Sequence, residues 1–221
     1  MGTPPSRYST FVTIPLPTDE QLGAKMVAKL KPANNLNVAR MLAGTTDMFD
    51  GAAGLVQAVF QAKDIDPQMR ELIILRSAYL LDCPYEWQAN VVMAKNTGCT
   101  QQQINAMTSE GPPTGLDDKT ALVMLATDEI TKAGTLTDAT LQRLRDNYDD
   151  IICRKFILII AWFNLLARFL NGCRVPLETG DKLGNRTSPH GYPGGAESPP
   201  SDDSNAGSCN RAKGVEPQFG E

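Results

Sequence analysis

The sequence predicts an all-α fold, a helical domain followed by a disordered tail. Helix start signals recur along the chain, the apolar residues between them follow helical spacing, and no convincing run alternates with a period of two. After residue 180, Gly, Pro, Ser and Asn make up about half of the residues. Such a segment can bury too little apolar surface to offset the conformational entropy lost on ordering. We expect an irregular arm at 1–13, a helical domain at 14–180 and a disordered tail at 181–221.

In the first half of the domain, capping residues mark the helix starts. Thr18 and the glutamine three residues later form a capping box, and Pro32 stops the helix that they open. Thr45 or Thr46 is the expected cap of a later helix, and Asp66 with the proline after it is an N-cap and N1 pair. The predicted helices span residues 18–30, 36–43, 45–62 and 66–81.

In the second half, Pro84 begins a helix that Gly98 ends, and Thr100 opens another capping box. The further predicted helices span 84–97, 100–107, 117–132, 137–147 and 149–172. The last of these is strongly apolar, but its longest run without a polar or charged residue, 156–163, is shorter than the ~18 residues of a membrane span. We expect it to be buried in the core or in a subunit interface.

Composition excludes several classes of function. A formal net charge of −4 without a basic run argues against nucleic acid or an anionic membrane as partner. Five cysteines without a Cys-x-x-Cys pair fit a reducing compartment, and the start lacks a secretory signal, so we expect a cytoplasmic protein. The single histidine, His190, lies in the predicted tail, which argues against triads and His-ligated metals; we expect no cofactor.

Residues 70–97 hold most of the chemistry. Cys83, Glu86 and Asn90 fall at i, i+3 and i+7, on one face of the predicted helix, and Glu71 on the preceding helix could meet that face. Two carboxylates with different burial can have their pKa values pushed apart. The pattern predicts one carboxyl group as an acid and the other as a base.

Structural roles are open for the same residues. Glu86 could be a capping carboxylate at N3, and Cys83 could be a small buried hydrophobe. Glu71, flanked by Arg70 and with Arg76 nearby, could be an ordinary ion-paired helix residue. Asn90 could be a polar core residue. Tyr85 and Trp87 could line a site or simply pack.

Asn164 and Arg168 lie one turn apart on the most apolar helix, where an unpaired charge is costly. Arg168 has the geometry to hold a substrate carboxylate. The alternative is a structural ion pair with an acidic partner such as Glu71.

Arg70-Glu71-Leu72, Cys83 and Tyr85-Glu86-Trp87 together resemble the carboxymuconolactone decarboxylase group of the alkylhydroperoxidase-D-like (AhpD-like) superfamily. Similar stretches occur at 15–20, 36–42, 159–164 and 168–171, so the resemblance spans roughly residues 14–178. It implies an AhpD-like helical bundle in a homo-oligomer, as a dimer, trimer or hexamer. It also implies either cofactor-free decarboxylation of an unsaturated lactone acid or peroxide reduction through paired cysteines.

The chain departs from that family at the centre of the motif. The redox branch has a second cysteine where this chain has Glu86, and a histidine where it has Asn90. Redox cycling therefore lacks its resolving thiol. Glu71 keeps the position of the family's proposed proton-shuttle carboxylate, while the missing histidine puts the standard proton-transfer assignment in doubt.

We expect a cofactor-independent lyase or isomerase acting on a small, oxygenated cyclic substrate, in a secondary-metabolite pathway. Its reaction would be decarboxylation, isomerisation, dehydration or cyclisation, since all of these pass through an enolate that the same groups could stabilise. Glu86 and Glu71 would handle protons, with Cys83 as a further catalytic candidate, and Asn90 would hold a substrate oxygen. The alternatives are a non-catalytic ligand-binding or scaffold oligomer and, last, a thiol peroxidase.

Overall fold

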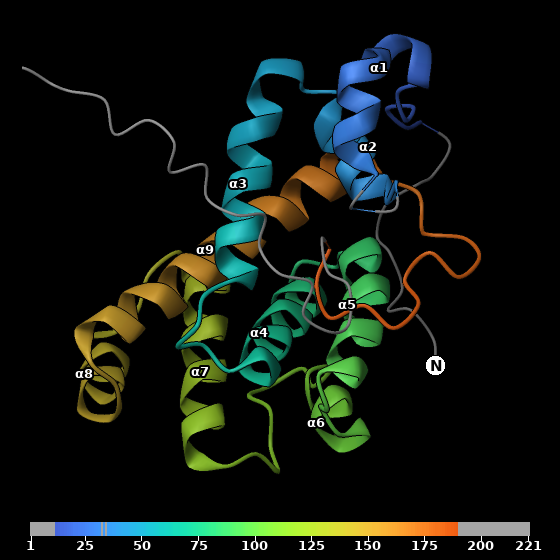
Figure 1. The fold of residues 1–221 in the computed structure, drawn as a ribbon. Helices are drawn as coiled ribbons and strands as arrows, with labels where there is room; N and C mark the ends of the chain where they lie inside the picture. The colour runs from blue at the N-terminus through green and yellow to red at the C-terminus, as the bar shows by residue number, and fades with distance from the viewer. Residues whose placement is uncertain (1–11, 32, 34, 190–221) are drawn as a thin grey trace, which may run out of the picture.

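The computed structural model describes residues 12–31, 33 and 35–189 (Figure 1). Within these ranges the chain forms helices joined by turns, without a strand, which confirms the all-α prediction. The predicted tail beyond 189, with His190, and the arm before residue 12 lie outside the described residues. The elements are α1 (Asp19–Leu30), α2 (Asn37–Ala43), η1 (Thr46–Met48), α3 (Phe49–Phe60), α4 (Pro67–Leu80), α5 (Pro84–Asn96), α6 (Gln101–Ala106), α7 (Asp118–Ala133), α8 (Asp138–Asn147) and α9 (Asp150–Cys173).

Both predicted capping boxes form. The Thr18 hydroxyl accepts from the Gln21 backbone N–H at 3.2 Å, and the Gln21 side chain accepts from the Thr18 N–H at 2.8 Å. Thr100 and Gln103 repeat the same pair of hydrogen bonds at the start of α6. Each box satisfies two backbone donors that a helix start leaves free.

Two details of the N-terminal helices differ from the prediction. Thr45 and Thr46 do not cap α3, because the Thr45 hydroxyl donates to the Leu42 carbonyl at 2.6 Å and a 3₁₀ turn intervenes before the helix. Helix α1 is interrupted at Gly23, which has φ 74°, a conformation that glycine adopts without steric cost.

Helix α4 is the centre of the fold and packs against α5, α7 and α9. All of its residues from Arg70 to Ala78 are buried, as expected for a helix that is surrounded by others. Arg76 is fully buried and bidentate to Asp128, with N–O distances of 2.6 and 2.9 Å. It also donates to three carbonyl oxygens of the loop that follows α6, so its charge is paired and its N–H groups are used.

Helix α9 runs across the molecule, and its buried side packs on α4 and α7 (Figure 1). Among the described residues it is the one helix with the length and hydropathy of a membrane span, and 56% of its most apolar window is buried inside the protein. Its outward face carries Ile151, Leu158 and Leu165, seven residues apart and each more than half exposed. The burial agrees with the predicted core helix, and the exposed stripe is a separate feature.

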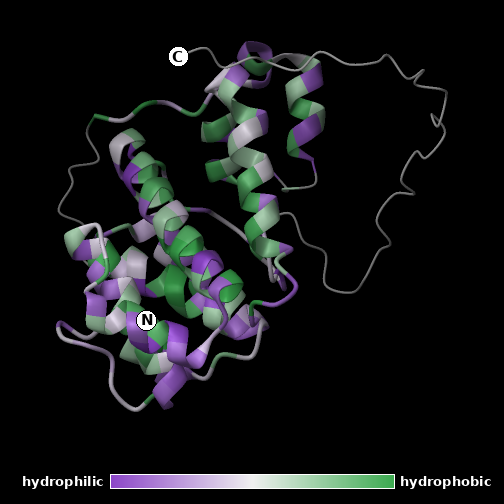
Figure 2. Cartoon of the chain, turned by 90° about the vertical axis from the view of Figure 1, so that its left-hand side faces the viewer, coloured by the Kyte–Doolittle hydropathy of each residue, from purple (hydrophilic) through white to green (hydrophobic). Residues whose placement is uncertain are grey.

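Helices α1 to α3 stand at one edge of the larger helix group, and the segment after α9 returns beside α5 (Figure 1). Seen from the side, hydrophobic and hydrophilic residues fall on different faces of many helices, the pattern of helices that pack through one face (Figure 2). The described chain continues past the predicted domain boundary at 180. Asn96 donates to the carbonyls of Gly184 and Arg186, contacts that composition alone does not reveal.

Candidate active site

The turn between α4 and α5 sets the direction of the helix that carries the motif. Asp82 adopts φ 51°, and the Cys83 N–H donates to the Ala78 carbonyl at 2.8 Å. Asn171 of α9 donates to the Leu81 carbonyl at 2.9 Å, which ties the turn to the core. With Pro84 at the first helical position, α5 presents the third and seventh residues of the helix toward α2, α3 and α9.

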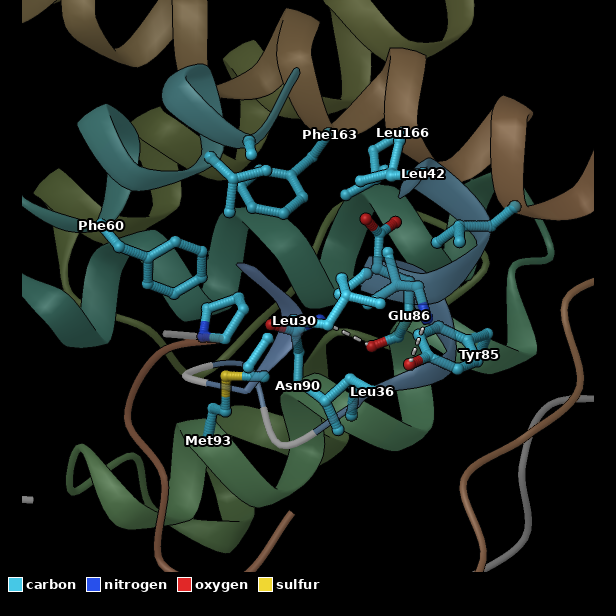
Figure 3. A pocket seen from close by; sticks show the side chains of 18 of the residues that line it. Leu30, Leu36, Leu42, Phe60, Tyr85, Glu86, Asn90, Met93, Phe163 and Leu166 are labelled. Atoms are coloured by element: carbon cyan, nitrogen blue, oxygen red, sulfur yellow. Dashed lines mark hydrogen bonds between the residues drawn. The ribbon is translucent and has the colours of Figure 1, made fainter. Parts of the chain in front are cut away.

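An apolar cavity lies where these helices meet (Figure 3). The atom-free space between its lining residues is about 740 Å³, a volume that includes open solvent at the mouth of the cavity. Glu86, Asn90 and Tyr85 of α5 line it together with side chains from the neighbouring helices. The apolar walls include Leu30, Leu36, Leu42, Phe60, Phe163 and Leu166.

Glu86 is the unusual group of the cavity. Its side chain points toward Leu42 and Leu166, and both carboxyl oxygens are buried without a hydrogen-bond partner (Figure 3). Burial raises the pKa of Glu86 well above its ordinary value, because an ionised carboxylate in apolar surroundings loses its hydration. Burial therefore favours the neutral acid form of Glu86, and the capping role considered for Glu86 does not occur, because neither oxygen accepts a backbone N–H.

Asn90 lies one turn further along α5 and faces the same cavity. Its amide N–H donates to the Glu86 backbone carbonyl at 2.8 Å, which fixes the orientation of the amide. The amide oxygen is buried and has no hydrogen-bond partner among the residues that the structure describes. A free donor and a free acceptor thus face one apolar space from adjacent turns.

Tyr85 lines the cavity, but its hydroxyl is occupied. It donates to Glu178, while it accepts from the Val38 backbone N–H at 3.0 Å. Glu178 also accepts from the Asn37 backbone N–H, so it joins α5 to the start of α2. Sequence reasoning missed Glu178, because its partners lie 93 and 141 residues away and leave no local signal.

Glu71 is not among the residues that line this cavity. It is fully buried on α4 and contacts Arg70, with a shortest N–O distance of 3.3 Å. Burial raises the pKa of Glu71 to about 8, although Arg70 opposes the shift. The structure thus holds two buried carboxyl groups with raised pKa values, and it brings only Glu86 into the cavity.

Cys83 and Trp87 are buried next to the site and do not line it. Burial and then the neighbouring Glu86 raise the pKa of the Cys83 thiol, which disfavours the reactive thiolate. Trp87 packs against Tyr79, with ring centroids 6.4 Å apart. Among the described residues, no group of three His, Cys, Asp or Glu side chains is placed to hold a metal ion.

Asn164 and Arg168 lie apart from the cavity of Glu86. The Asn164 amide donates to the Thr131 hydroxyl at 2.9 Å, and Arg168 donates to the backbone and side-chain oxygens of Asn164. Arg168 lines a different hollow with Asn171 and Arg174. The structure therefore separates the predicted anion anchor from the acid, and Glu71 pairs with Arg70 instead of Arg168.

Comparison with known proteins bears on the family and the fold of the chain. The profile of the Carboxymuconolactone decarboxylase family matches residues 46–129, which include α4, α5, Glu71 and Glu86. No curated protein sequence matches the chain at a significant level.

Two solved structures share the fold. One is the alkylhydroperoxidase AhpD core of an uncharacterized peroxidase-related protein from Ralstonia eutropha JMP134, with a TM-score of 0.64, 18% identity, and coverage of 85% of this chain and 100% of that chain. The other is a protein of unknown function from Agrobacterium tumefaciens, with a TM-score of 0.56, 20% identity, and coverage of 61% and 92%. The matched profile shows that residues 46–129 are similar to the carboxymuconolactone decarboxylase family, and the two structures show that the chain has an AhpD-like fold.

Proposed function

We propose that the protein is a cofactor-independent lyase or isomerase in which Glu86 transfers protons to and from a small oxygenated cyclic substrate. The observation that carries the proposal is the Glu86 carboxyl group, buried in the cavity with both oxygens free. A buried carboxyl group without hydrogen-bond partners lowers the stability of the folded protein. A bound substrate would supply the missing partners.

A single carboxylic acid is sufficient for an enolisation step. Its O–H can give a proton to a substrate carbonyl oxygen while its other oxygen takes the proton from the neighbouring carbon. The C–H bond breaks, the O–H bond of the enol forms, and Glu86 ends with one proton, as it began. No net charge develops in the apolar cavity, where a charge would be expensive, and no histidine is required.

The remaining residues support this step. Asn90 offers its amide oxygen to a substrate hydroxyl, and Tyr85 holds the wall of α2 against α5 through Val38 and Glu178. A role of Glu71 as a second proton donor or acceptor stays a prediction, because Glu71 does not line the cavity. A thiol peroxidase is disfavoured, since the Cys83 thiol is buried with a raised pKa.

Hydrogen–deuterium exchange of an enolisable probe tests the proposal without knowledge of the natural substrate. 2-Hydroxy-1-(4-fluorophenyl)ethanone in D₂O should exchange its CH₂ hydrogens faster with the wild-type protein, as followed by ¹H NMR. Glu86→Gln should lower the catalysed rate by about 10²–10⁴-fold. Glu129→Gln, which changes a glutamate of α7 outside the cavity lining, is the control and should keep the rate.

An unchanged rate in Glu86→Gln would contradict the proposal. Saturable binding of the probe without exchange in the wild-type protein would favour a ligand-binding protein over an enzyme.

We also propose a homo-oligomer, in which the exposed stripe of Ile151, Leu158 and Leu165 on α9 packs against the same stripe of a second copy. Their seven-residue spacing keeps them on one face of the helix. Ala161, which lies between Leu158 and Leu165, is exposed on the same face and leaves room for a close approach of two helices.

A further inference from the structure

Among the described residues that line the cavity, no unpaired charge is available to neutralise an anionic ligand. Lys29 is the cationic residue of its lining, and its ammonium group already binds both oxygens of Asp50 at 2.6 and 2.7 Å. Arg70 contacts Glu71 and lies over the Phe60 ring, 4.4 Å from its centroid. A carboxylate placed beside Glu86 would therefore be desolvated without a counter-ion, which is strongly unfavourable.

The unused hydrogen-bonding groups define a complementary pattern. The neutral Glu86 carboxyl group has one donor, and the Asn90 amide oxygen is an acceptor. They stand at i and i+4 on α5, where side chains are neighbours. A ligand that satisfies both groups has an acceptor and a donor on adjacent or nearly adjacent atoms.

Apart from Lys29 and Tyr85, the remaining described lining is apolar and includes the aromatic rings of Phe60 and Phe163. The hydroxyl of Tyr85, the third polar group, already has Glu178 and the Val38 N–H as partners. Further polar atoms on a ligand would therefore add little to its binding free energy, whereas apolar surface buried against this lining would strengthen binding.

We infer that the substrate is an uncharged, largely apolar ring compound with a neighbouring carbonyl and hydroxyl or enol group, its carbonyl accepting from Glu86 and its hydroxyl donating to Asn90. This inference rests on the proposed function and narrows it. An uncharged substrate has no carboxylate to lose, so the reaction is an isomerisation, dehydration or cyclisation instead of a decarboxylation. The substrate then differs in charge from the lactone acids that the family resemblance implied.

Two fluorinated probes of the same skeleton test the inference by binding alone. 2-Hydroxy-1-(4-fluorophenyl)ethanone is neutral and has the adjacent carbonyl and hydroxyl. 4-Fluorobenzoylformate replaces the CH₂OH group by a carboxylate. In ¹⁹F NMR titrations of the full chain at pH 7, the neutral probe should bind saturably, and the anion at least about 100-fold more weakly. This comparison needs no variant.

Asn90→Leu, of similar volume, tests the second contact and should weaken binding of the neutral probe by about three- to tenfold. Asn147→Leu is the matched control, because Asn147 makes the same side-chain bond to a carbonyl four residues earlier, on the exposed end of α8. It should leave the affinity unchanged.

Equal affinity for the two probes, preference for the anion, or no saturable binding of either would overturn the inference. The proposed function can fail separately: if Glu86→Gln keeps the proton exchange while the neutral probe is still preferred, the acid/base role is wrong and the ligand class stands. If the wild-type protein exchanges protons and binds the anion equally well, only the ligand class is wrong.

Discussion

Replacement of Glu86 by glutamine should change how the stability of the protein depends on pH. Unfolded Glu86 loses its proton around its ordinary pKa of 4.5, whereas the folded protein keeps it to a much higher pH. Between these two pKa values the folded state binds one more proton, so the stability due to this group is complete below pH 4.5 and is lost as the pH rises. The loss is about 1.4 kcal/mol of unfolding free energy per pH unit.

Glu86→Gln removes this titration and leaves the others in place. The free energy of unfolding of the variant, minus that of the wild type, should therefore rise by up to about 1.4 kcal/mol per pH unit as the pH is raised from 5.5 toward the raised pKa of Glu86. Urea denaturation followed by circular dichroism measures it. The protein concentration must be fixed, since association would shift the apparent stability.

The control is Glu129→Gln. Burial acts against the shift, but hydrogen bonds from Thr137 and Thr140 lower the pKa of Glu129 below its ordinary value, so this group causes no loss of stability as the pH rises. The free energy of unfolding of Glu129→Gln, minus that of the wild type, should not rise between pH 5.5 and 7.5. Parallel curves for the wild type and Glu86→Gln would refute the reasoning, because they would mean that Glu86 is ionised in the folded protein.

Four further outcomes are expected. Glu71→Gln should likewise flatten the stability profile, but only up to about pH 8, the pKa of Glu71, and should lower proton exchange far less than Glu86→Gln. Arg76→Leu should cost about 3–5 kcal/mol in urea denaturation, because it leaves Asp128 with a buried charge and without its arginine partner. Cys83→Ser should leave peroxide consumption at its wild-type background, and a thiol-dependent loss would revive the peroxidase. Leu158→Glu should reduce the molar mass measured by light scattering, and an unchanged mass would exclude the α9 contact.

The sequence predicted most helices because their start signals are local. The capping boxes at Thr18 and Thr100 and the pair at Asp66 and Pro67 involve residues within one turn, and all three form. The predicted start of α3 was wrong because the Thr45 hydroxyl donates to a competing local acceptor, the Leu42 carbonyl.

The site was harder to predict than the fold. Spacing placed Glu86 and Asn90 on one face of α5, and both line the cavity. It left Glu71 open between a proton-transfer role and an ion pair with Arg70. It could not show that Arg168 contacts Asn164, because that choice depends on how α9 rotates in the packed core. The role of Glu178 depends on contacts across 93 and 141 residues, which no local pattern encodes.

The most direct test of the central claim is the protonation state of Glu86 itself. Infrared difference spectra between the wild-type protein and Glu86→Gln, recorded at pH 7, separate the C=O band of a protonated carboxyl group from the bands of a carboxylate. We predict a protonated carboxyl band that is present in the wild type, absent in the variant, and shifted when the neutral probe accepts its hydrogen bond. Carboxylate bands in its place would contradict the account of a neutral acid in an apolar cavity.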